Sequence, residues 1–192
     1  MCIRDRSHIL PIRYALFVSS LGAVAGTTFS VMAILTIGDI GGGLSVSSDD
    51  AAWLNTLYNV GAICGLPIIM TMAASLGRGR AMLLAGLFYT LSSIAVAVSP
   101  FYEWALVARF IHGFFGGMLP VLMMQLVMTS LFPGRGQLEG MTLFAVATSI
   151  GTGMAASIGG YLLTEFGWRG LFWIQALVGG VYTLLALKVL PD

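Results

Sequence analysis

Six long apolar segments dominate the chain, and short polar connections separate them. Each segment approaches or exceeds the length of about 20 mostly apolar residues that a helix needs to cross a bilayer. A helix satisfies its own backbone hydrogen bonds, so it is the open-ended element that hydrocarbon tolerates. The pattern therefore predicts an all-α polytopic membrane protein, with transmembrane helices at about residues 14–38, 51–74, 81–99, 102–131, 138–163 and 170–190.

The charges in the connections predict the orientation of these helices. Lys and Arg concentrate in the cytoplasmic loops of membrane proteins. One set of alternate connections and ends holds Arg13, Arg78, Arg80, Arg135 and Lys188. The opposite set holds Arg169 together with Asp39, Asp49, Asp50, Glu103 and Glu165. We therefore expect the protein to lie in the cell (inner) membrane, with both ends of this segment in the cytoplasm.

The composition supports a surface that faces lipid. Hydrophobic residues make up 58% of the chain and charged residues 9%, whereas an ordinary soluble domain has roughly 25% charged residues. A soluble fold of this composition could not cover its surface with polar side chains. The lipid bilayer is the expected partner. The net charge of +1 does not indicate nucleic acid, and the few possible ligands predict neither a metal nor a cofactor.

An intramembrane enzyme, such as a rhomboid-like protease, is the remote alternative. It needs a serine nucleophile and a histidine base on nearby helices. The chain has no Gly-x-Ser-x-Gly or Gly-Ala-Ser-Gly element, and beyond its first residues His112 is the only histidine. We therefore expect that the protein is not an enzyme.

The first residues, Met-Cys-Ile-Arg-Asp followed by Arg, match the translation of a common sequencing adapter. We expect residues 1–6 to be non-native, and such segments are excluded from fold reasoning. Residues 7–192 then form an N-terminal six-helix transmembrane domain. An untrimmed adapter in the raw reads would confirm this hypothesis, and ordinary genomic sequence would refute it.

Ionisable residues inside a span are candidates for function, because a charge at mid-bilayer costs about 2.5–3.5 kcal/mol. Arg109 lies in the fourth segment, with His112 one helical turn away. Gly113, Gly116 and Pro120 continue the helical face of Arg109. Either Arg109 reaches back to the outer headgroups, or this face of small residues and proline points into the bundle.

Neutral polar residues also interrupt the spans. Asn55 and Asn59 are four residues apart in the second segment, with Tyr58 beside them, and Gln125 lies late in the fourth. These side chains face either a cavity or a neighbouring helix. No acidic residue lies deep in any predicted span, although a buried carboxylate is the usual proton carrier.

Small residues four apart mark surfaces where helices approach closely in lipid. The fifth segment has the longest such stripe, with Ala147, Gly151, Ala155 and Gly159 on one face and Gly160 next to it. The stripe indicates either permanent helix packing or an interface that slides to open and close a pathway.

These residues together resemble the N-terminal half of a major facilitator superfamily transporter, most closely the fourteen-helix multidrug:proton antiporters. The resemblance runs in order from about Gly38 to Asp192. It rests on Asp39-Ile40, Asp50-Ala51-Ala52-Trp53 with Tyr58, Leu76 to Arg80, Leu106 to Gly113, Leu119-Pro120 with Gln125, Leu131-Phe132-Pro133, Gly159 to Leu162, and Trp168-Arg169 with Phe172.

A faint internal repeat agrees with this resemblance. Leu76-Gly77-Arg78-Gly79 and Phe166-Gly167-Trp168-Arg169 occupy equivalent connections on opposite sides of the membrane. Three helices repeated with inverted topology are typical of each six-helix half of the superfamily. The fold class that we expect is therefore a 3+3 inverted repeat, half of a major facilitator fold.

Several positions depart from the family pattern. The signature loop has Met70, Ala74 and Ser75 in place of its usual glycine, aspartate and first basic residue. Ala155-Ala156 replaces the Gly-Pro of the fifth-helix antiporter motif. In the same comparison, Phe29 stands where the family has an acid in the first helix, and His112 stands where it has a glutamine. These departures leave an importer or uniporter of a small solute as the alternative function.

The resemblance implies a secondary transporter that exports amphipathic or drug-like small molecules in exchange for protons by alternating access. It assigns proton coupling to Arg109 and His112, and it places Asn55, Tyr58, Asn59 and Gln125 near the substrate pathway. Gly77, Arg78 and Arg80 correspond to the cytoplasmic gate. The residues expected to pack the helices and to let them flex are Gly113, Gly151, Ala155, Gly159 and Gly160. A C-terminal transmembrane half is the expected missing partner.

Overall fold

The computed structural model describes residues 9–130 and 135–189. The described residues form helices and connections without a strand, which confirms the all-α class. In chain order the helices are α1 (Ile9–Leu35), α2 (Ile37–Gly43), α3 (Ser48–Leu76), α4 (Arg78–Ala97), α5 (Tyr102–Gly116), α6 (Met118–Ser130) and α7 (Arg135–Ala186), followed by a 3₁₀ turn, Leu187–Val189. The suspected adapter residues and the Leu131-Phe132-Pro133 motif lie outside the described residues.

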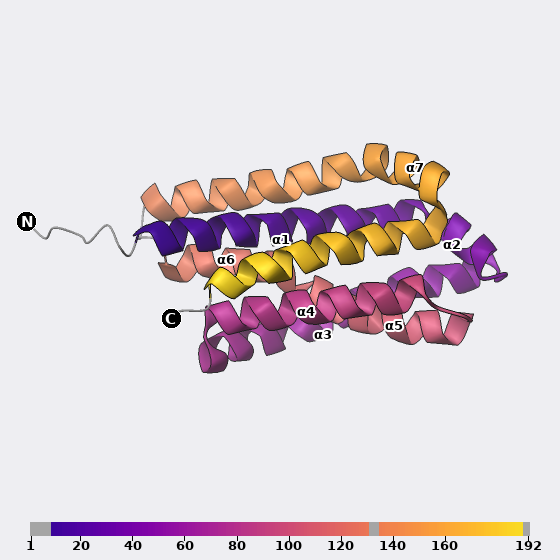
Figure 1. Ribbon diagram of the computed structural model, residues 1–192, viewed down its shortest axis with the longest axis horizontal. Helices are drawn as coiled ribbons and strands as arrows, with labels where there is room; N and C mark the ends of the chain where they lie inside the picture. The colour runs from indigo at the N-terminus through magenta and orange to yellow at the C-terminus, as the bar shows by residue number, and fades with distance from the viewer. Residues whose placement is uncertain (1–8, 131–134, 190–192) are drawn as a thin grey trace, which may run out of the picture.

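The described helices make six passes along one bundle. Five stretches are long and apolar enough to cross a membrane, and the last of them runs from Gly136 to Val189. That stretch reverses direction near Gly167, so it supplies two passes (Figure 1). α5 and α6 together form the fourth pass, within Tyr102–Met128. The arrangement agrees with the six predicted transmembrane helices.

Two glycines make the tight reversals that the repeat predicted. Gly77, between α3 and α4, has φ 85° and ψ 154°, and Gly167 has φ 66° and ψ 179°. Positive φ is strained for residues with a Cβ atom. A Cβ atom at either glycine would have no neighbour within 4 Å. Backbone conformation, not crowding, therefore requires glycine at both equivalent turns.

The first outer connection differs from the prediction. We expected one span to residue 38 followed by a short polar connection. The structure ends α1 at Leu35, and Thr36 leaves the helical conformation with φ −105° and ψ 14°. The segment from Ile37 to Gly43, which contains Asp39 and four glycines, then forms the short helix α2. Its buried residue Ile40 packs near Leu54, which explains why this glycine-rich segment is ordered as a helix.

Pro120 explains the break between α5 and α6. Proline has no backbone N–H, so it cannot donate a hydrogen bond to the carbonyl four residues earlier, which is that of Gly116. The helix ends at Gly116 and resumes at Met118. α1 passes closely there, because a Cβ atom on Gly26 would lie 3.3 Å from the Gly116 oxygen.

α3 and α5 approach each other backbone to backbone through three glycines. A Cβ atom at Gly61 would collide with the Phe110 carbonyl oxygen, and one at Gly113 with the Tyr58 carbonyl oxygen. Gly65 faces the Phe114 oxygen in the same way. Such close approach is how helices associate in lipid. It brings the side chains of α3 and α5 that carry the candidate site into contact.

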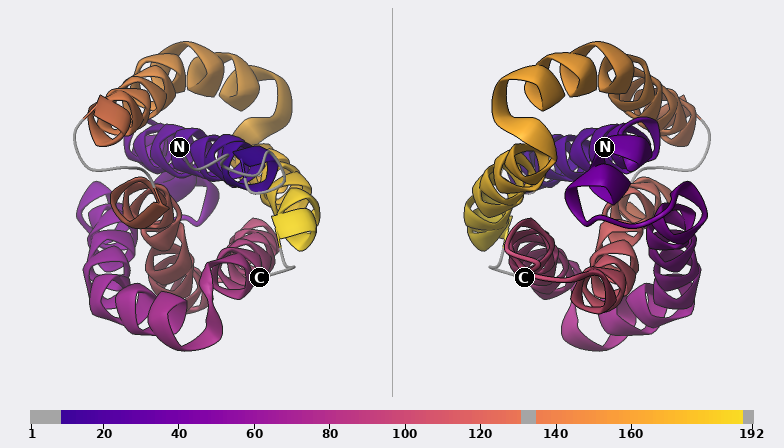
Figure 2. Two further views of the ribbon diagram at one scale, coloured as in Figure 1. Left: turned by 90° about the vertical axis from the view of Figure 1, so that its left-hand side faces the viewer. Right: turned by 90° about the vertical axis from the view of Figure 1, so that its right-hand side faces the viewer.

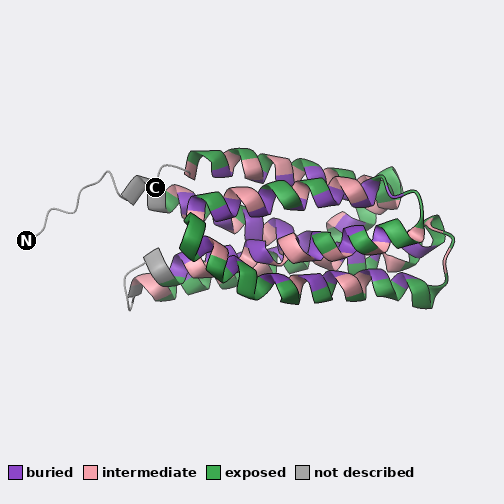
Figure 3. Ribbon diagram, turned by 90° about the horizontal axis from the view of Figure 1, so that it is seen from below, coloured by how far each residue is buried: buried purple, intermediate pink, exposed green. Residues whose placement is uncertain are grey.

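Exposed residues cover the outside of the bundle (Figure 3), and many of them are large and hydrophobic. Ile63 of α3 is 67% exposed and Leu177 of α7 is 66% exposed. In water such surfaces would be a liability, whereas lipid solvates them. Viewed along the bundle, α1 lies between the two passes of α7 (Figure 2). The polar groups that contact one another around Arg109 and His112 lie among α3, α4, α5 and the second pass of α7.

Candidate functional site

Arg109 of α5 points into the bundle and does not reach back to the headgroups. Its side chain is 1% exposed. Within the described ranges, it is the one buried side chain that carries a permanent charge. The interpretation in which the face of Arg109, Gly113 and Gly116 points inward is therefore confirmed: all three are buried.

Neutral groups surround the Arg109 guanidinium. Nε donates to the Leu54 carbonyl oxygen at 3.4 Å, and Nη1 lies 3.2 Å from Nδ1 of His112. The Tyr58 ring lies below the guanidinium carbon at 4.6 Å and the Phe172 ring at 5.6 Å. Nη2 has no hydrogen-bond partner among the described residues. A buried charge without an opposite charge is costly, so aromatic rings and a carbonyl dipole provide its main stabilisation.

His112 links Arg109 to two other helices. The ring is fully buried, and its Nε2 lies 3.2 Å from Ser93 Oγ of α4 and 2.7 Å from the side-chain amide of Gln175 in α7. That amide also lies 2.7 Å from the Tyr89 hydroxyl. The structure thus joins the two predicted coupling residues in one polar cluster, which we call the Arg109 network: Leu54, Tyr58, Tyr89, Ser93, Arg109, His112 and Gln175.

Tyr58 connects the Arg109 network to α1. Its ring is buried beneath Arg109, and its hydroxyl lies near the Ser30 side chain of α1. A Cβ atom on Gly116 would lie 2.9 Å from that hydroxyl, so the glycine makes room for it. Of the predicted pathway residues, Tyr58 is therefore the one that contacts Arg109.

The other predicted pathway residues lie apart from Arg109. Asn55 is half-buried, and its Oδ1 has no hydrogen-bond partner among the described residues. Asn59 is exposed, and its amide donates to the backbone oxygen of Asn55 at 3.0 Å. Gln125 is half-buried on α6, beyond the helix break. These three residues do not form one cluster with the coupling residues.

The predicted gate residues lie at the turn between α3 and α4. Gly77 makes the turn, Arg78 begins α4 half-buried, and Arg80 is exposed. These positions place two arginines at the end of the bundle. Their role in gating stays a prediction.

The small-residue stripe of α7 packs within this half of the fold. Cβ atoms at Gly151 and Gly159 would meet Thr27 and Met32 of α1, and Ala155 is buried in the same contact. Gly160 is exposed, and a Cβ atom there would have no neighbour within 4 Å. The structure therefore separates Gly160 from the other three residues.

This separation predicts opposite outcomes for two matched substitutions. Gly151→Ala places a methyl group against Thr27 Oγ1 and the Val24 carbonyl oxygen, and we expect a loss of about 1–3 kcal/mol of stability from overpacking. Gly160→Ala should be neutral or slightly stabilising, because alanine favours helix. Thermal unfolding of the purified variants measures both. Equal melting temperatures would contradict the assigned α1–α7 contact.

The polar groups that the sequence did not indicate as members of the site are Tyr89, Ser93 and Gln175. Gln175 is 2% exposed and lies inside the last apolar segment. Burying an amide in an apolar span is costly, so the presence of Gln175 in that span could have indicated a buried hydrogen-bond partner. The partners themselves could not be read from the sequence, because Gln175 contacts His112 across 63 positions.

A second cluster holds the opposite end of the bundle together. Arg169 Nη2 donates to the Ser99 carbonyl oxygen at 3.0 Å, and its guanidinium lies 4.9 Å from the Trp168 ring. The Trp168 indole fills the space next to Gly43, where a Cβ atom would collide with it. Three connections meet here, and we interpret the cluster as structural.

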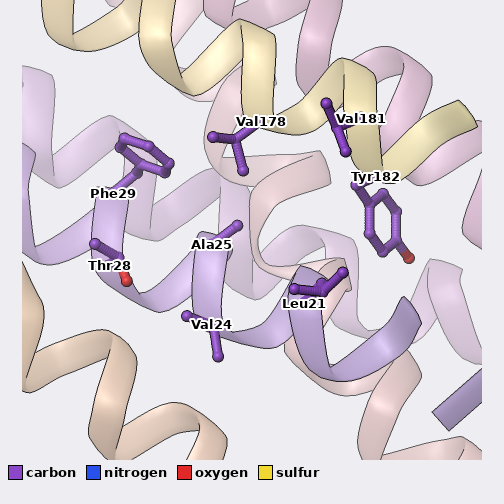
Figure 4. Close-up of a pocket in the computed structure, with 8 residues that line it drawn as sticks. All are labelled: Leu21, Val24, Ala25, Thr28, Phe29, Val178, Val181 and Tyr182. Carbon is purple, nitrogen blue, oxygen red and sulfur yellow. The ribbon is translucent and has the colours of Figure 1, made fainter. Parts of the chain in front are cut away.

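A cavity of about 190 Å³ lies between α1 and the second pass of α7 (Figure 4). Its lining is almost wholly apolar: Leu21, Val24, Ala25, Thr28, Phe29, Val178, Val181 and Tyr182. Phe29, which stands where the related antiporters carry an acid, is part of this wall. Among the described residues no group of three His, Cys, Asp or Glu could hold a metal ion.

Comparisons with known proteins agree with this architecture. The family model described as Major Facilitator Superfamily matches residues 16–192. The chain is 28% identical over 145 residues to the colistin resistance protein EmrB of Acinetobacter baumannii, covering 75% of this chain and 28% of that protein. It is 26% identical over 179 residues to the probable multidrug resistance protein EmrY of Escherichia coli, covering 93% of this chain and 34% of that protein. The chain thus spans about a third or less of these relatives.

Solved structures show the same fold at lower identity. A D-xylose-proton symporter superposes with a TM-score of 0.75 at 16% identity, over 92% of this chain and 48% of that one. The human organic anion transporter MFSD10 superposes with a TM-score of 0.72 at 20% identity, over 94% of this chain and 48% of that one. The chain therefore corresponds to about half of each fold.

Proposed function

The chain belongs to the Major Facilitator Superfamily, and from this premise we propose that it forms the N-terminal half of a proton-coupled exporter of amphipathic or drug-like small molecules. The exporter works by alternating access. Membership makes it a transporter and not an enzyme. The buried, uncompensated charge of Arg109 is the observation that carries the coupling proposal.

Arg109 fits a coupling role because of its charge and its surroundings. Electrostatic interactions are strong where the dielectric is low. A fixed positive charge there favours the ionised form of any acid that comes to face it, and the acid then releases its proton. The described residues place no carboxylate against Arg109. We therefore place the proton-carrying acid on the second half of the transporter or on the substrate.

Tyr58 and Ser30 place the Arg109 network beside the pathway. The two side chains lie close together where α3 faces α1, and the Tyr58 ring lies against the guanidinium. We assign Asn55, Asn59 and Gln125 to the wall of the same pathway as polar contacts for the substrate. Gly77, Arg78 and Arg80 act as the cytoplasmic gate, and both ends of the segment lie on the cytoplasmic side of the inner membrane.

The second transmembrane half is the partner that this arrangement requires. The first pass of α7 exposes Ser149, Thr152 and Gly153, which line a hollow on one helix. Polar side chains are poorly solvated by lipid. We assign this face to contact with the second half, and we assign the buried stripe to packing against α1.

Substitutions at Tyr58 separate its two contacts. Tyr58→Phe keeps the ring below Arg109 and loses the hydroxyl, so we expect transport to fall only a few-fold. Tyr58→Leu removes the cation–π contact, worth about 2 kcal/mol when buried, and transport should fall at least about tenfold. The initial rates of efflux by the complete protein measure both. Equal losses would show that the ring does not hold Arg109.

Importer or uniporter activity is the second candidate. Ala155-Ala156 stands in place of the Gly-Pro that the related antiporters have, which favours this alternative. Export and import predict opposite changes in the amount of dye that cells accumulate. Cells that lack their main efflux pumps would express the complete protein and be loaded with a fluorescent cationic amphipath.

An exporter lowers dye accumulation, and a protonophore abolishes the difference. An importer raises accumulation, and a uniporter only speeds equilibration. Either of the last two results would overturn the proposed direction. An Arg109→Gln variant, matched for expression, is the control for coupling.

A further inference from the structure

His112 is held on every side by neighbours from other helices. Its ring contacts the rings of Tyr58 and Tyr89 at centroid distances of 5.4 and 5.0 Å, and both of its nitrogens have polar partners. No water-exposed edge remains, because the residue is fully buried. Its hydrogen bonds must therefore be satisfied within the Arg109 network.

The partners on both sides of the ring together determine where its proton lies. The guanidinium of Arg109 has only donors, so Nδ1 of His112 must accept from Nη1. A neutral imidazole then carries its proton on Nε2. Ser93 is consistent with this, because its hydroxyl hydrogen is donated to the Tyr89 carbonyl oxygen at 2.8 Å. The Ser93 oxygen is thus free to accept from Nε2–H at 3.2 Å.

The same bookkeeping orients the Gln175 amide. With its nitrogen toward His112, two N–H groups would meet at 2.7 Å, or both ring nitrogens would have to accept. A half-turn of the amide places Oε1 there, where it accepts from Nε2–H of His112 and from the Tyr89 hydroxyl. Oxygen and nitrogen of an amide are distinguished by their hydrogen bonds, and this orientation satisfies both donors.

We propose that Gln175 is a positioning residue for Arg109: through its amide oxygen it holds His112 in the neutral form protonated at Nε2, so that Nδ1 receives the guanidinium. Gln175 lies in the second pass of α7 and His112 and Arg109 lie in α5. The coupling site therefore includes the second pass of α7, although no residue of that pass donates or accepts a hydrogen bond with the Arg109 guanidinium. Its functional part rests on the proposed role of Arg109 in transport.

Two substitutions test whether Gln175 acts as an acceptor. Leucine removes the acceptor and keeps an apolar side chain of similar size, while glutamate keeps an oxygen for both donors and adds a charge. The carboxylate would also favour protonation of His112 as the pH falls. An imidazolium cannot accept from Arg109. The titratable groups that face the ring are Arg109, Tyr58 and Tyr89, and none of them carries a negative charge at neutral pH.

The spectroscopic measurement uses the complete protein in nanodiscs with ¹⁵N-labelled histidine. The signals of His112 are those that disappear in His112→Gln. We expect one neutral tautomer of His112, with an unprotonated Nδ1 and a protonated Nε2. In Gln175→Leu the ratio of this form to the Nδ1-protonated form should fall several-fold, because Nε2–H loses the nearer of its two acceptors and keeps only Ser93 Oγ at 3.2 Å. Thr183→Val, on the same helix, is the matched control, since its hydroxyl bonds only to the Gly179 oxygen.

The transport measurement compares the same variants between about pH 8 and pH 5.5, the range in which histidine titrates. Gln175→Leu should be slow at every pH. Gln175→Glu should be a few-fold slower than the wild type at the upper end, because its carboxylate partly compensates the charge of Arg109, and should lose about tenfold more than the wild type at the lower end. A purely structural role would not produce this pH dependence in one variant alone.

The outcomes separate the two proposals. A wild-type His112 protonated at Nδ1, or a tautomer ratio that is unchanged in Gln175→Leu, overturns the positioning role. So does a Gln175→Glu profile that parallels the wild type while Arg109→Gln is inactive. If the spectra are as expected but Arg109→Gln transports normally, the proposed coupling role of Arg109 fails, and the tautomer assignment stands.

Discussion

Arg109→Gln in the complete protein is expected to abolish proton-driven export while the protein still reaches the membrane. We expect the rate to fall by at least about a hundredfold, which corresponds to about 2.7 kcal/mol. Gln removes the charge but can still hydrogen-bond His112 or Leu54, so the fold should survive. The physical reason is that the described part of this half buries one permanent charge, and coupling needs a charge where the dielectric is low.

Arg109→Lys is the informative control for this prediction. Lysine keeps the charge but lacks the planar fork that donates to two partners and stacks on Tyr58 and Phe172. We expect a rate between those of the wild type and the glutamine variant. The measurement is substrate efflux from energised cells at equal surface expression. Wild-type export by Arg109→Gln would contradict the coupling role.

Gly113→Ala is expected to have the largest effect on stability. Its methyl group would collide with the Tyr58 carbonyl oxygen, a backbone atom that moves only if α3 and α5 separate. Overpacking typically costs about 1–3 kcal/mol and occasionally more, and this contact offers no flexible side chain to yield. The displacement would also move Tyr58 away from Arg109, so transport should be lost together with stability.

Gly180→Ala is the matched control for this substitution. It adds the same methyl group inside an apolar helix, and no atom lies within 4 Å of it. Thermal unfolding in detergent should show a large drop in the melting temperature for Gly113→Ala and little change for Gly180→Ala. A Gly113→Ala variant that melts with the wild type would mean that α3 and α5 are further apart than described.

The passes were predictable because span length and apolarity are properties of single segments. Gly77 and Gly167 illustrate a stronger prediction: the repeat indicated that their connections are equivalent, and both proved to be positive-φ turns. The helix α2 could not be predicted in the same way. Three consecutive glycines indicate a turn, and only packing of Ile40 beneath the neighbouring helices favours a helix there.

The site was predicted in its position but not in its partners. Arg109 and His112 could be found because ionisable groups are rare in spans. Their stabilisation comes from the Leu54 carbonyl, two aromatic rings and Gln175, which lie on other helices. A sequence shows which residues share a helical face. It does not show which helix lies opposite that face.

The stripe of α7 shows the same limit. Spacing of four predicted that Gly151, Ala155 and Gly159 make a helix contact, and the structure places all three against α1. The spacing could not show whether the opposing helix belongs to this half or to another one. The exposed position of Gly160 became evident only from the rotation of the helix within the bundle.

The most direct test of the account is substrate movement in proteoliposomes that contain the complete protein, under a proton gradient imposed in either direction. We expect substrate to accumulate on the side from which protons leave. Reversing the gradient should reverse the movement, and Arg109→Gln should abolish both. Substrate that moves with the protons, or that equilibrates regardless of the gradient, would contradict proton-coupled export.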